Sequence, residues 1–222
     1  MSKSQKDIFL EQEGDMWFTR NKDVISCPDL SKSVLFYENY LQSGFRILEI
    51  GCANGYNLNY FHSRFDCECY GIDPSASAIN DGKQKYPQLN LAVGTADTLD
   101  FSDGFFNFVL FGFCLYLTDR NLLSKIISES DRVLKNKGYI GITDFDTKIP
   151  KKRPYKHFNG IMSYKMDYSS LFLVYPHFSL ADKYCFSHSD SHFVTDVKER
   201  VCSCVLYKDM ETAYLIEEDG CT

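Results

Sequence analysis

The sequence predicts an α/β fold in which a mostly parallel sheet carries helices on both faces. Between residues 45 and 145, short apolar segments alternate with segments of helical periodicity. Two further strand-like segments follow near the end of the chain. Alternation of this kind is typical of parallel sheets, because each connecting helix packs back onto the sheet. The composition indicates a globular chain: of 222 residues, 44% are hydrophobic, with only 6 prolines and 13 glycines.

The individual elements are predicted in order along the chain. Residues 31–42 are expected to form a helix, with Ser31 as the N-cap and Ser43-Gly44 as the stop. The expected strands are 46–50, 67–73, 89–94, 105–112, 138–145, 178–188 and 199–209. The expected connecting helices are 57–65, 75–86 and 120–134. Residues 146–178, basic and turn-prone at first and then rich in Tyr and Phe, are expected to form an insert before the last two strands.

The charge and the N-terminal residues exclude several classes of protein. A net charge of −6 gives no global positive field to attract nucleic acid or an anionic membrane. Residues 1–15 lack the apolar core of a signal peptide, and no apolar run approaches the length of a membrane span. We therefore expect a cytoplasmic protein, monomeric or homodimeric, that binds neither nucleic acid nor membrane.

The nine cysteines are expected to be buried free thiols. Their odd number, without an export signal, argues against a disulfide framework. The pairs Cys67/Cys69 and Cys202/Cys204 could in principle supply thiolates to zinc. Both pairs, however, lie in strand-like segments and lack the C-x-x-C spacing of structural zinc sites. We predict no metal site, since no D-x-D cluster or His-rich spacing indicates one.

The first strand is followed by a glycine turn that predicts a ligand site. Gly51 and Gly55 let the backbone turn sharply after Glu49, and the helix that begins near Tyr56 directs its N-terminal amides into the same space. Asp73 ends the second strand, about twenty residues further on, where a carboxylate can accept both hydroxyls of a ribose. Ligands of open α/β sheets bind at these carboxyl ends of strands. The sequence therefore predicts a nucleotide-type cofactor.

Two cofactor classes compete for this turn. A dinucleotide fingerprint is G-x-G-x-x-G, whereas this chain has G-x-A-x-G, with Ala53 in place of the middle glycine. That pattern weakens the prediction of NAD or FAD. The segment ILEIGCANGYNL (47–58) instead resembles the first motif of class I S-adenosylmethionine-dependent methyltransferases, whose loop wraps the amino-acid end of the cofactor.

Three further segments resemble motifs of the same family, in the same order. They are YGIDPS (70–75), VGTADTLDFSDGFFNFV (93–109) and DRVLKNKGYIGITDF (131–145). The chain departs from the family pattern at Ala53, where most members carry Gly, and at Thr95 and Asn107, where they carry Asp. The resemblance implies S-adenosylmethionine as the cofactor. It assigns cofactor binding to Glu49, Gly51, Cys52, Ala53, Gly55, Asp73, Pro74, Thr95, Ala96, Asp97 and Phe113.

The resemblance also implies an architecture. The family's fold is a Rossmann-like seven-stranded sheet whose last strand is antiparallel and inserted beside the fifth, so the segments 178–188 and 199–209 would be the sixth and seventh strands. Residues 1–44 would form an N-terminal helical cap over the cofactor. Residues 45–222 would form the methyltransferase domain, with a substrate-side insert at about 146–178.

The candidate catalytic residues follow from the chemistry of methyl transfer. Donor and acceptor must be held in line, and an oxygen acceptor also requires a general base. The candidates are His157, in the loop after the fifth strand, and Tyr116, where many relatives carry His. An unperturbed phenol titrates near ~10, so Tyr116 is expected to line the cleft rather than accept a proton. His62 lies within a predicted helix and is expected to be structural.

The predicted acceptor is a small molecule. Trp17, Arg20 and Tyr164 are the candidate acceptor-binding residues, although Trp17 could equally anchor the N-terminal segment to the core. The Tyr-rich insert resembles bacterial methyltransferases of polysaccharide or activated-sugar biosynthesis, which favours a sugar or nucleotide-sugar hydroxyl. The alternatives are a protein or RNA methyltransferase and a non-catalytic cofactor-binding partner subunit. The acidic net charge counts against RNA.

Overall fold

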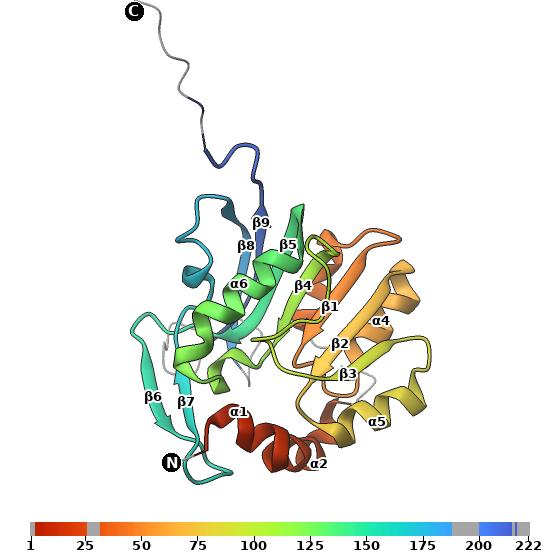
Figure 1. Ribbon diagram of the computed structural model, residues 1–222, viewed down its shortest axis with the longest axis vertical. Helices are drawn as coiled ribbons and strands as arrows, with labels where there is room; N and C mark the ends of the chain where they lie inside the picture. The colour runs from red at the N-terminus through yellow and green to blue at the C-terminus, as the bar shows by residue number, and fades with distance from the viewer. Residues whose placement is uncertain (1–2, 26–31, 188–199, 215, 217–222) are drawn as a thin grey trace, which may run out of the picture.

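The sheet has seven strands, one of them antiparallel to the rest. The computed structural model of the chain describes residues 3–25, 32–187, 200–214 and 216. Its strand order is β3-β2-β1-β4-β5-β9-β8 (Figure 1). These strands are β1 (Arg46–Ile50), β2 (Glu68–Asp73), β3 (Asn90–Val93), β4 (Phe106–Gly112), β5 (Leu134–Phe145), β8 (Phe178–Ser187) and β9 (Arg200–Lys208). β9 pairs antiparallel with both β5 and β8, so the predicted fold is confirmed.

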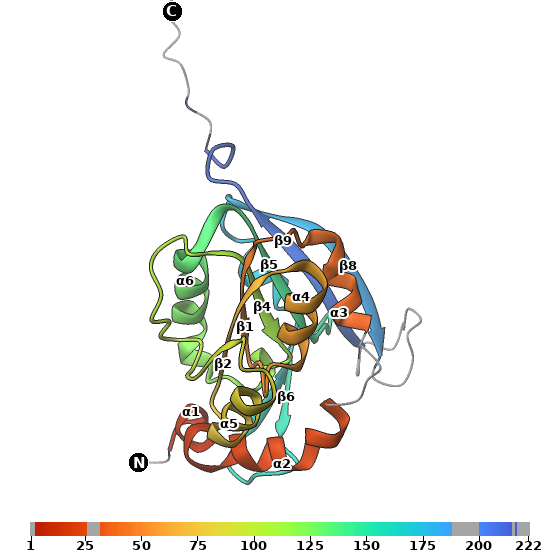
Figure 2. The same ribbon diagram turned by 90° about the vertical axis from the view of Figure 1, so that its right-hand side faces the viewer.

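Helices cover both faces of this sheet. Figure 2 shows α6 (Leu123–Val133) on one side and α3 (Lys32–Tyr37) and α4 (Tyr56–Phe65) on the other. Successive side chains of a strand point to opposite faces. Neighbouring residues of β1 therefore enter different cores: Leu48 packs in the core that includes α6, and Ile47 in the core that includes α4. Burial on both faces explains why the central strands are almost continuously apolar.

Some element boundaries differ from the prediction. β5 begins at Leu134 rather than at residue 138, because its first residue still pairs with Phe106 of β4. The helix predicted at residues 31–42 is α3, continued by a 3-10 turn at Glu38–Tyr40. The predicted N-cap Ser31 lies outside the described residues, as do residues 188 and 199, the predicted bounds of the last two strands.

The N-terminal segment lies across the carboxyl ends of the parallel strands (Figure 1). It consists of α1 (Gln5–Ile8), a π-helical turn (Phe9–Glu13) and α2 (Gly14–Ile25). The backbone amides of Gln5 and Lys6 donate to the Asp119 carboxylate at 3.0 and 2.8 Å. At the other end, the Ser75 hydroxyl donates to Asp15 at 2.6 Å. The segment is thus fixed to the loops that follow both β4 and β2.

The insert after β5 contains a hairpin that the sequence did not predict. It pairs β6 (Lys151–Pro154) antiparallel with β7 (Met162–Lys165). β6 is exposed along its whole length, so its sequence shows no apolar alternation from which a strand could be inferred. Gln5 joins the hairpin to the N-terminal segment, since its Oε1 accepts from the Met162 amide at 2.7 Å.

Three further predictions concern free cysteines, the lack of a metal site and the lack of a membrane-spanning helix. Cys67, Cys69, Cys202 and Cys204 are buried and free. Across the described ranges, no group of three or more His, Cys, Asp or Glu side chains is placed to hold a metal ion. Within the same ranges, no helix combines the length and apolar character needed to cross a membrane.

Candidate active site

The loop after β1 folds back tightly on the ends of β2 and β4. Gly51 has a left-handed backbone (φ +75°), and its amide donates to the carbonyl of Ile72 at 2.9 Å. A Cβ atom on Gly51 would lie 2.8 Å from the Cβ of Cys114, so only glycine fits there. Ala53 is also left-handed, at φ +49°, which costs an L residue roughly 1–2 kcal/mol. The loop therefore holds backbone strain where the resembled family carries glycine.

Asp73 closes this loop from the end of β2. Its Oδ2 accepts from the Ala53 amide at 2.9 Å, and its Oδ1 accepts from the Ser75 amide at 2.8 Å, just before α5 (Ala76–Lys85). Burial raises the pKa of Asp73 to about 6, although these two amides act in the opposite direction. Each carboxylate oxygen retains a lone pair for a further donor. Asp73 can therefore accept hydroxyl groups of a ligand bound beside the loop.

Glu49 lies in the interior at the end of β1, with 1% of its surface exposed. Its Oε1 accepts from Nδ2 of Asn57 at 2.8 Å, whereas its Oε2 is buried and has no hydrogen-bond partner among the described residues. Burial raises the pKa of Glu49 to about 7. A buried carboxylate oxygen is costly to leave unpaired. The site therefore suits a ligand that supplies a cation or an N–H donor to Oε2.

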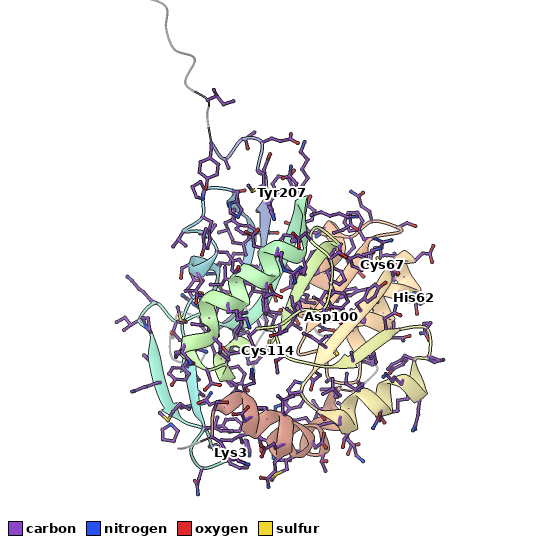
Figure 3. All side chains as sticks on the ribbon, viewed as in Figure 1. Lys3, His62, Cys67, Asp100, Cys114 and Tyr207 are labelled. Carbon is purple, nitrogen blue, oxygen red and sulfur yellow. The ribbon has the colours of Figure 1, made fainter. Side chains whose placement is uncertain are left out.

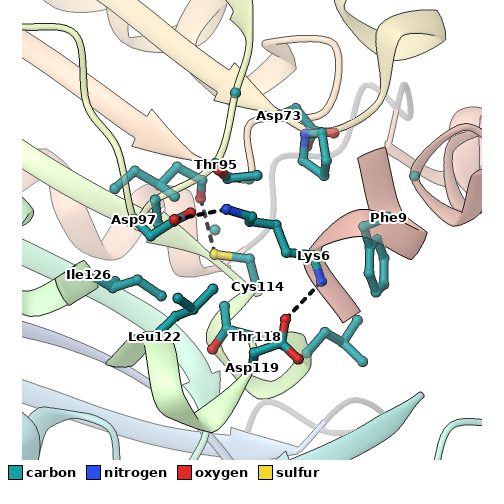
Figure 4. A pocket seen from close by; sticks show the side chains of 18 of the residues that line it. Lys6, Phe9, Asp73, Thr95, Asp97, Cys114, Thr118, Asp119, Leu122 and Ile126 are labelled. Carbon is teal, nitrogen blue, oxygen red and sulfur yellow. Dashed lines mark hydrogen bonds and ion pairs between the residues drawn. The ribbon is translucent and has the colours of Figure 1, made fainter. Parts of the chain in front are cut away.

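A first cavity, of about 890 Å³, lies between the ends of β2 and β4 and the N-terminal segment (Figure 4). Lys6 reaches from α1 to Asp97, with 3.0 Å between Nζ and Oδ2. Burial opposes ionisation of Asp97, but a hydrogen bond with Thr95 and the charge of Lys6 hold its pKa below the ordinary value. Asp97 therefore stays a carboxylate inside the cavity.

A second cavity, of about 1110 Å³, adjoins the first. Trp17, Gly51, Gly112 and Phe113 line both cavities. Phe113 has a left-handed backbone (φ +56°), and its amide donates to the Thr143 carbonyl of β5 at 2.9 Å. Strained non-glycine residues of this kind cluster at functional sites. A molecule that occupied both cavities would lie beside Trp17 and Phe113.

Aromatic rings form much of the wall of the second cavity. Trp17, Tyr37, Phe113 and Tyr116 all line it. The rings of Phe113 and Tyr116 meet edge to face, with 5.4 Å between centroids. Burial raises the pKa of Tyr37 and of Tyr116, so both phenols stay protonated near neutral pH. Tyr116 can therefore donate a hydrogen bond but cannot serve as a base.

Two predicted residues of the insert lie outside both cavities. His157 is exposed in the loop between β6 and β7, where its ring contacts that of Tyr155 at 5.3 Å. Tyr164 of β7 lies beneath the guanidinium of Arg120, at 4.3 Å from the ring centroid. The hairpin exposes His157 to solvent, whereas Tyr164 packs beside the loop after β4 without lining either cavity. This placement removes the basis for a catalytic His157 and an acceptor-binding Tyr164.

Arg20 and His62 are held by contacts of their own. Arg20 of α2 forms an ion pair with Glu13, whose side chain is fully buried, and lines neither cavity. His62 lies with Nδ1 2.9 Å from the carbonyl oxygen of Cys67, just before β2, whereas Cys114 follows the end of β4 (Figure 3). His62 is therefore at the opposite end of the strands from the cavities, consistent with a structural role.

Most of the cofactor-binding residues predicted from the resemblance line one of the two cavities. Those in the first cavity are Asp73, Pro74, Thr95, Ala96 and Asp97. Those in the second are Glu49, Cys52 and Ala53, while Gly51 and Phe113 belong to both. Gly55 lines neither, and its left-handed backbone (φ +79°) forms the N-cap of α4.

Several lining residues were missed from the sequence. Asn57 and Lys6 are examples, and both touch an acidic residue of the site. Asn57 is the second residue of α4, the helix that directly follows the glycine turn, so its proximity to Glu49 could have been inferred. Lys6 is 91 positions from Asp97, and nothing in the local pattern indicates that the two residues meet.

Part of the chain is similar to known methyltransferases. Residues 47–138 match a family model described as a methyltransferase domain. An uncharacterized methyltransferase of Synechocystis sp. is 29% identical over 104 residues, which cover 47% of this chain and 49% of that protein. The match therefore spans about half the length of this curated relative.

Solved structures share the fold. A 1,6-didemethyltoxoflavin-N1-methyltransferase of Burkholderia thailandensis superposes with a TM-score of 0.72 at 12% identity, covering 94% of this chain and 92% of that one. A SAM-dependent methyltransferase of Methanosarcina mazei gives 0.65 at 20% identity, covering 82% and 100%. At these identities the likeness concerns the fold.

Proposed function

We propose that this chain, which carries a class I S-adenosylmethionine-dependent methyltransferase domain, methylates a small organic molecule held in the second cavity. The proposal rests on one observation above all. The two cavities share Trp17 and Phe113 in their linings, and each holds acidic side chains suited to one end of the cofactor: Asp73 and Asp97 in the first, Glu49 in the second. We also propose residues 1–44 as the cap and residues 45–222 as the methyltransferase domain, with the insert at about 146–178.

The residues of the two cavities fit S-adenosylmethionine. Asp73 would accept the ribose hydroxyls, and Thr95, Ala96 and Asp97 would surround the adenine. The unused Oε2 of Glu49 would pair with the ammonium of the methionine end, which relieves the cost of burying that oxygen. The sulfonium of the bound cofactor supplies the reactive methyl group.

The task of the chain is to orient the two reactants and to exclude water. Orientation of a donor and an acceptor can contribute about 7–11 kcal/mol to a displacement reaction. Trp17 and Phe113 line both cavities, so they would hold the reacting groups in register. The hydrogen bonds of the N-terminal segment to Asp119 and Ser75 would keep this segment in place over the site.

Some structurally similar methyltransferases were solved with a small molecule bound, which supports a small acceptor. The methyltransferase of Burkholderia thailandensis was solved with 1,6-didemethyltoxoflavin and S-adenosylhomocysteine, and another, of Streptomyces coelicolor, with geranyl diphosphate. A sugar hydroxyl, the acceptor favoured by the sequence, would need a general base. Tyr116 is held protonated by burial, and Glu49 would be engaged by the cofactor. We therefore do not propose a sugar.

The test is calorimetric titration with S-adenosylhomocysteine, with NAD as the control. We expect binding of the former only, and we expect Asp73→Asn to weaken it about tenfold, as for a charge-assisted hydrogen bond. Asp100→Asn, at an exposed residue (labelled in Figure 3) that lines neither cavity, is the matched control and should bind normally. Well-folded protein that did not bind S-adenosylhomocysteine would refute the proposal. Binding without methyl transfer to any molecule of a metabolite extract would instead indicate a macromolecular acceptor or a partner subunit.

A further inference from the structure

We infer that the acceptor is an uncharged, planar heteroaromatic molecule that presents a carbonyl or ring-nitrogen acceptor to the hydroxyl of Tyr116, and that it is methylated on a ring nitrogen. This inference rests on the proposed function and specifies its substrate class. Three features of the second cavity carry it: the shape given by its aromatic wall, the unused Tyr116 hydroxyl, and the lack of a Lys or Arg side chain among the described residues that line it.

The aromatic wall is held in fixed orientations. Phe113 packs edge to face on Tyr116 and on Phe145, with centroids 5.4 and 5.2 Å apart. Tyr37 packs edge to face on Phe108 at 5.7 Å, and its hydroxyl is 2.8 Å from Oγ1 of Thr143. Rings that are locked by their neighbours in this way cannot adapt to a rounded ligand. They favour a flat π-system, which gains most from stacking and edge contacts.

Tyr116 supplies the polar contact that would orient such a molecule. Within the described part of the chain, its hydroxyl forms no hydrogen bond, although the residue lines the second cavity. Burial keeps the phenol protonated, so it is a donor. Thr143, another hydroxyl of the lining, is already bonded to Tyr37 and to Ser203 at 2.8 and 3.0 Å. A ligand with a carbonyl or ring-nitrogen acceptor would therefore satisfy Tyr116.

The electrostatics of the cavity disfavour an anion. Glu49 is the one acidic or basic side chain among the described residues that line it. No Lys or Arg side chain among the described residues lines this cavity to pair with a phosphate or carboxylate of the acceptor, and an anion without a cationic partner is costly to bury. The basic residues of β6 are exposed along the hairpin and do not line the cavity. An uncharged acceptor avoids this cost.

The same surroundings indicate the acceptor atom. A ring nitrogen uses its own lone pair to form the N–C bond as the C–S bond breaks, and the electron pair of that bond returns to sulfur. The nitrogen is of the pyridine type, so it has no proton to lose, and the methylated product carries the positive charge that leaves sulfur. A ring nitrogen therefore needs no side chain to accept a proton, in contrast to an alcohol.

Trp17 provides the assay, because it is the only tryptophan and it lines both cavities. In ¹⁵N-labelled protein saturated with S-adenosylhomocysteine, its indole N–H signal is followed during titration with lumazine, 4-quinazolinone and indole, and separately with UDP-glucose. We expect saturable shifts with the three aromatic probes and none with UDP-glucose. Absence of a shift with every aromatic probe, or saturable binding of UDP-glucose, would overturn the inference. Failure of S-adenosylhomocysteine itself to bind would refute the proposed function instead.

Tyr116→Phe tests the hydrogen bond without altering the shape of the wall. The variant should bind lumazine and 4-quinazolinone about three- to tenfold more weakly. Its affinity for indole, which offers no carbonyl or basic ring nitrogen, should be unchanged. Tyr175→Phe, at an exposed ring outside both cavities, is the matched control. Equal weakening of all three probes would show a purely structural role for Tyr116 and would contradict the assigned contact.

Discussion

Glu49 makes cofactor binding depend on pH, and the size of the effect follows from its burial. Burial raises the pKa of Glu49 from an ordinary 4.5 to about 7 in the free protein. The cofactor ammonium pairs with the ionised carboxylate only, so binding must release a proton below this pKa. With a pKa near 7, the affinity for S-adenosylhomocysteine should rise roughly tenfold between pH 6 and pH 8.

Calorimetry in two buffers of different ionisation enthalpy measures the released proton directly. At pH 7 we expect about half a proton per molecule of S-adenosylhomocysteine bound, falling toward zero at pH 8.5. Glu49→Gln should abolish most of this release and weaken binding at pH 8 by about 10- to 100-fold, the loss expected for a charge-assisted hydrogen bond.

Two results would refute this reasoning. One is a wild-type affinity that does not change between pH 6 and pH 8. The other is Glu49→Gln protein that binds with wild-type affinity at pH 8. The matched control is Glu68→Gln, because Glu68 is exposed, pairs with Arg46 on the surface and lines neither cavity.

The remaining predictions concern stability and the N-terminal segment. Ala53→Gly should relieve the left-handed strain and raise the free energy of unfolding by about 1 kcal/mol, measured by urea denaturation; a lower stability would contradict the backbone assignment. Burial raises the pKa values of Glu49 and Asp73 in the folded protein to about 7 and 6, whereas both carboxyl groups titrate near pH 4 in the unfolded chain. Between about pH 4 and these raised values, the folded protein without cofactor therefore binds more protons than the unfolded chain. Its melting temperature should therefore be higher at pH 5.5 than at pH 8, and saturating S-adenosylhomocysteine should reduce this difference. Lys6→Met should speed dissociation of S-adenosylhomocysteine about two- to fivefold, as for a partly exposed ion pair, in stopped-flow measurements. Lys3→Met, at an exposed side chain, should not, and equal rates in the two variants would exclude a role for the Lys6 contact.

The sequence by itself determined the elements whose signals are local. The strand β1 was predicted with its observed bounds, Arg46–Ile50, because an apolar run followed by a glycine turn needs no distant information. The same holds for Asp73, whose place at the end of β2 follows from its position in the chain. Once the sheet is parallel, the carboxyl ends of these strands must meet at one edge, so the loop and Asp73 come together.

Tertiary structure alone decided what closes the site. Trp17 was expected near the acceptor from the family resemblance, but Lys6 was not. Lys6 reaches the site because the N-terminal segment docks on Asp119 and Ser75, and hydrogen bonds between residues so far apart leave no periodicity in the sequence. His157 was predicted near the acceptor because it follows the fifth strand, but the hairpin of the insert carries it to the exposed surface. Chain order fixes where a strand ends, whereas the path of a long loop depends on packing with segments elsewhere in the chain, and that packing is set only in the folded protein.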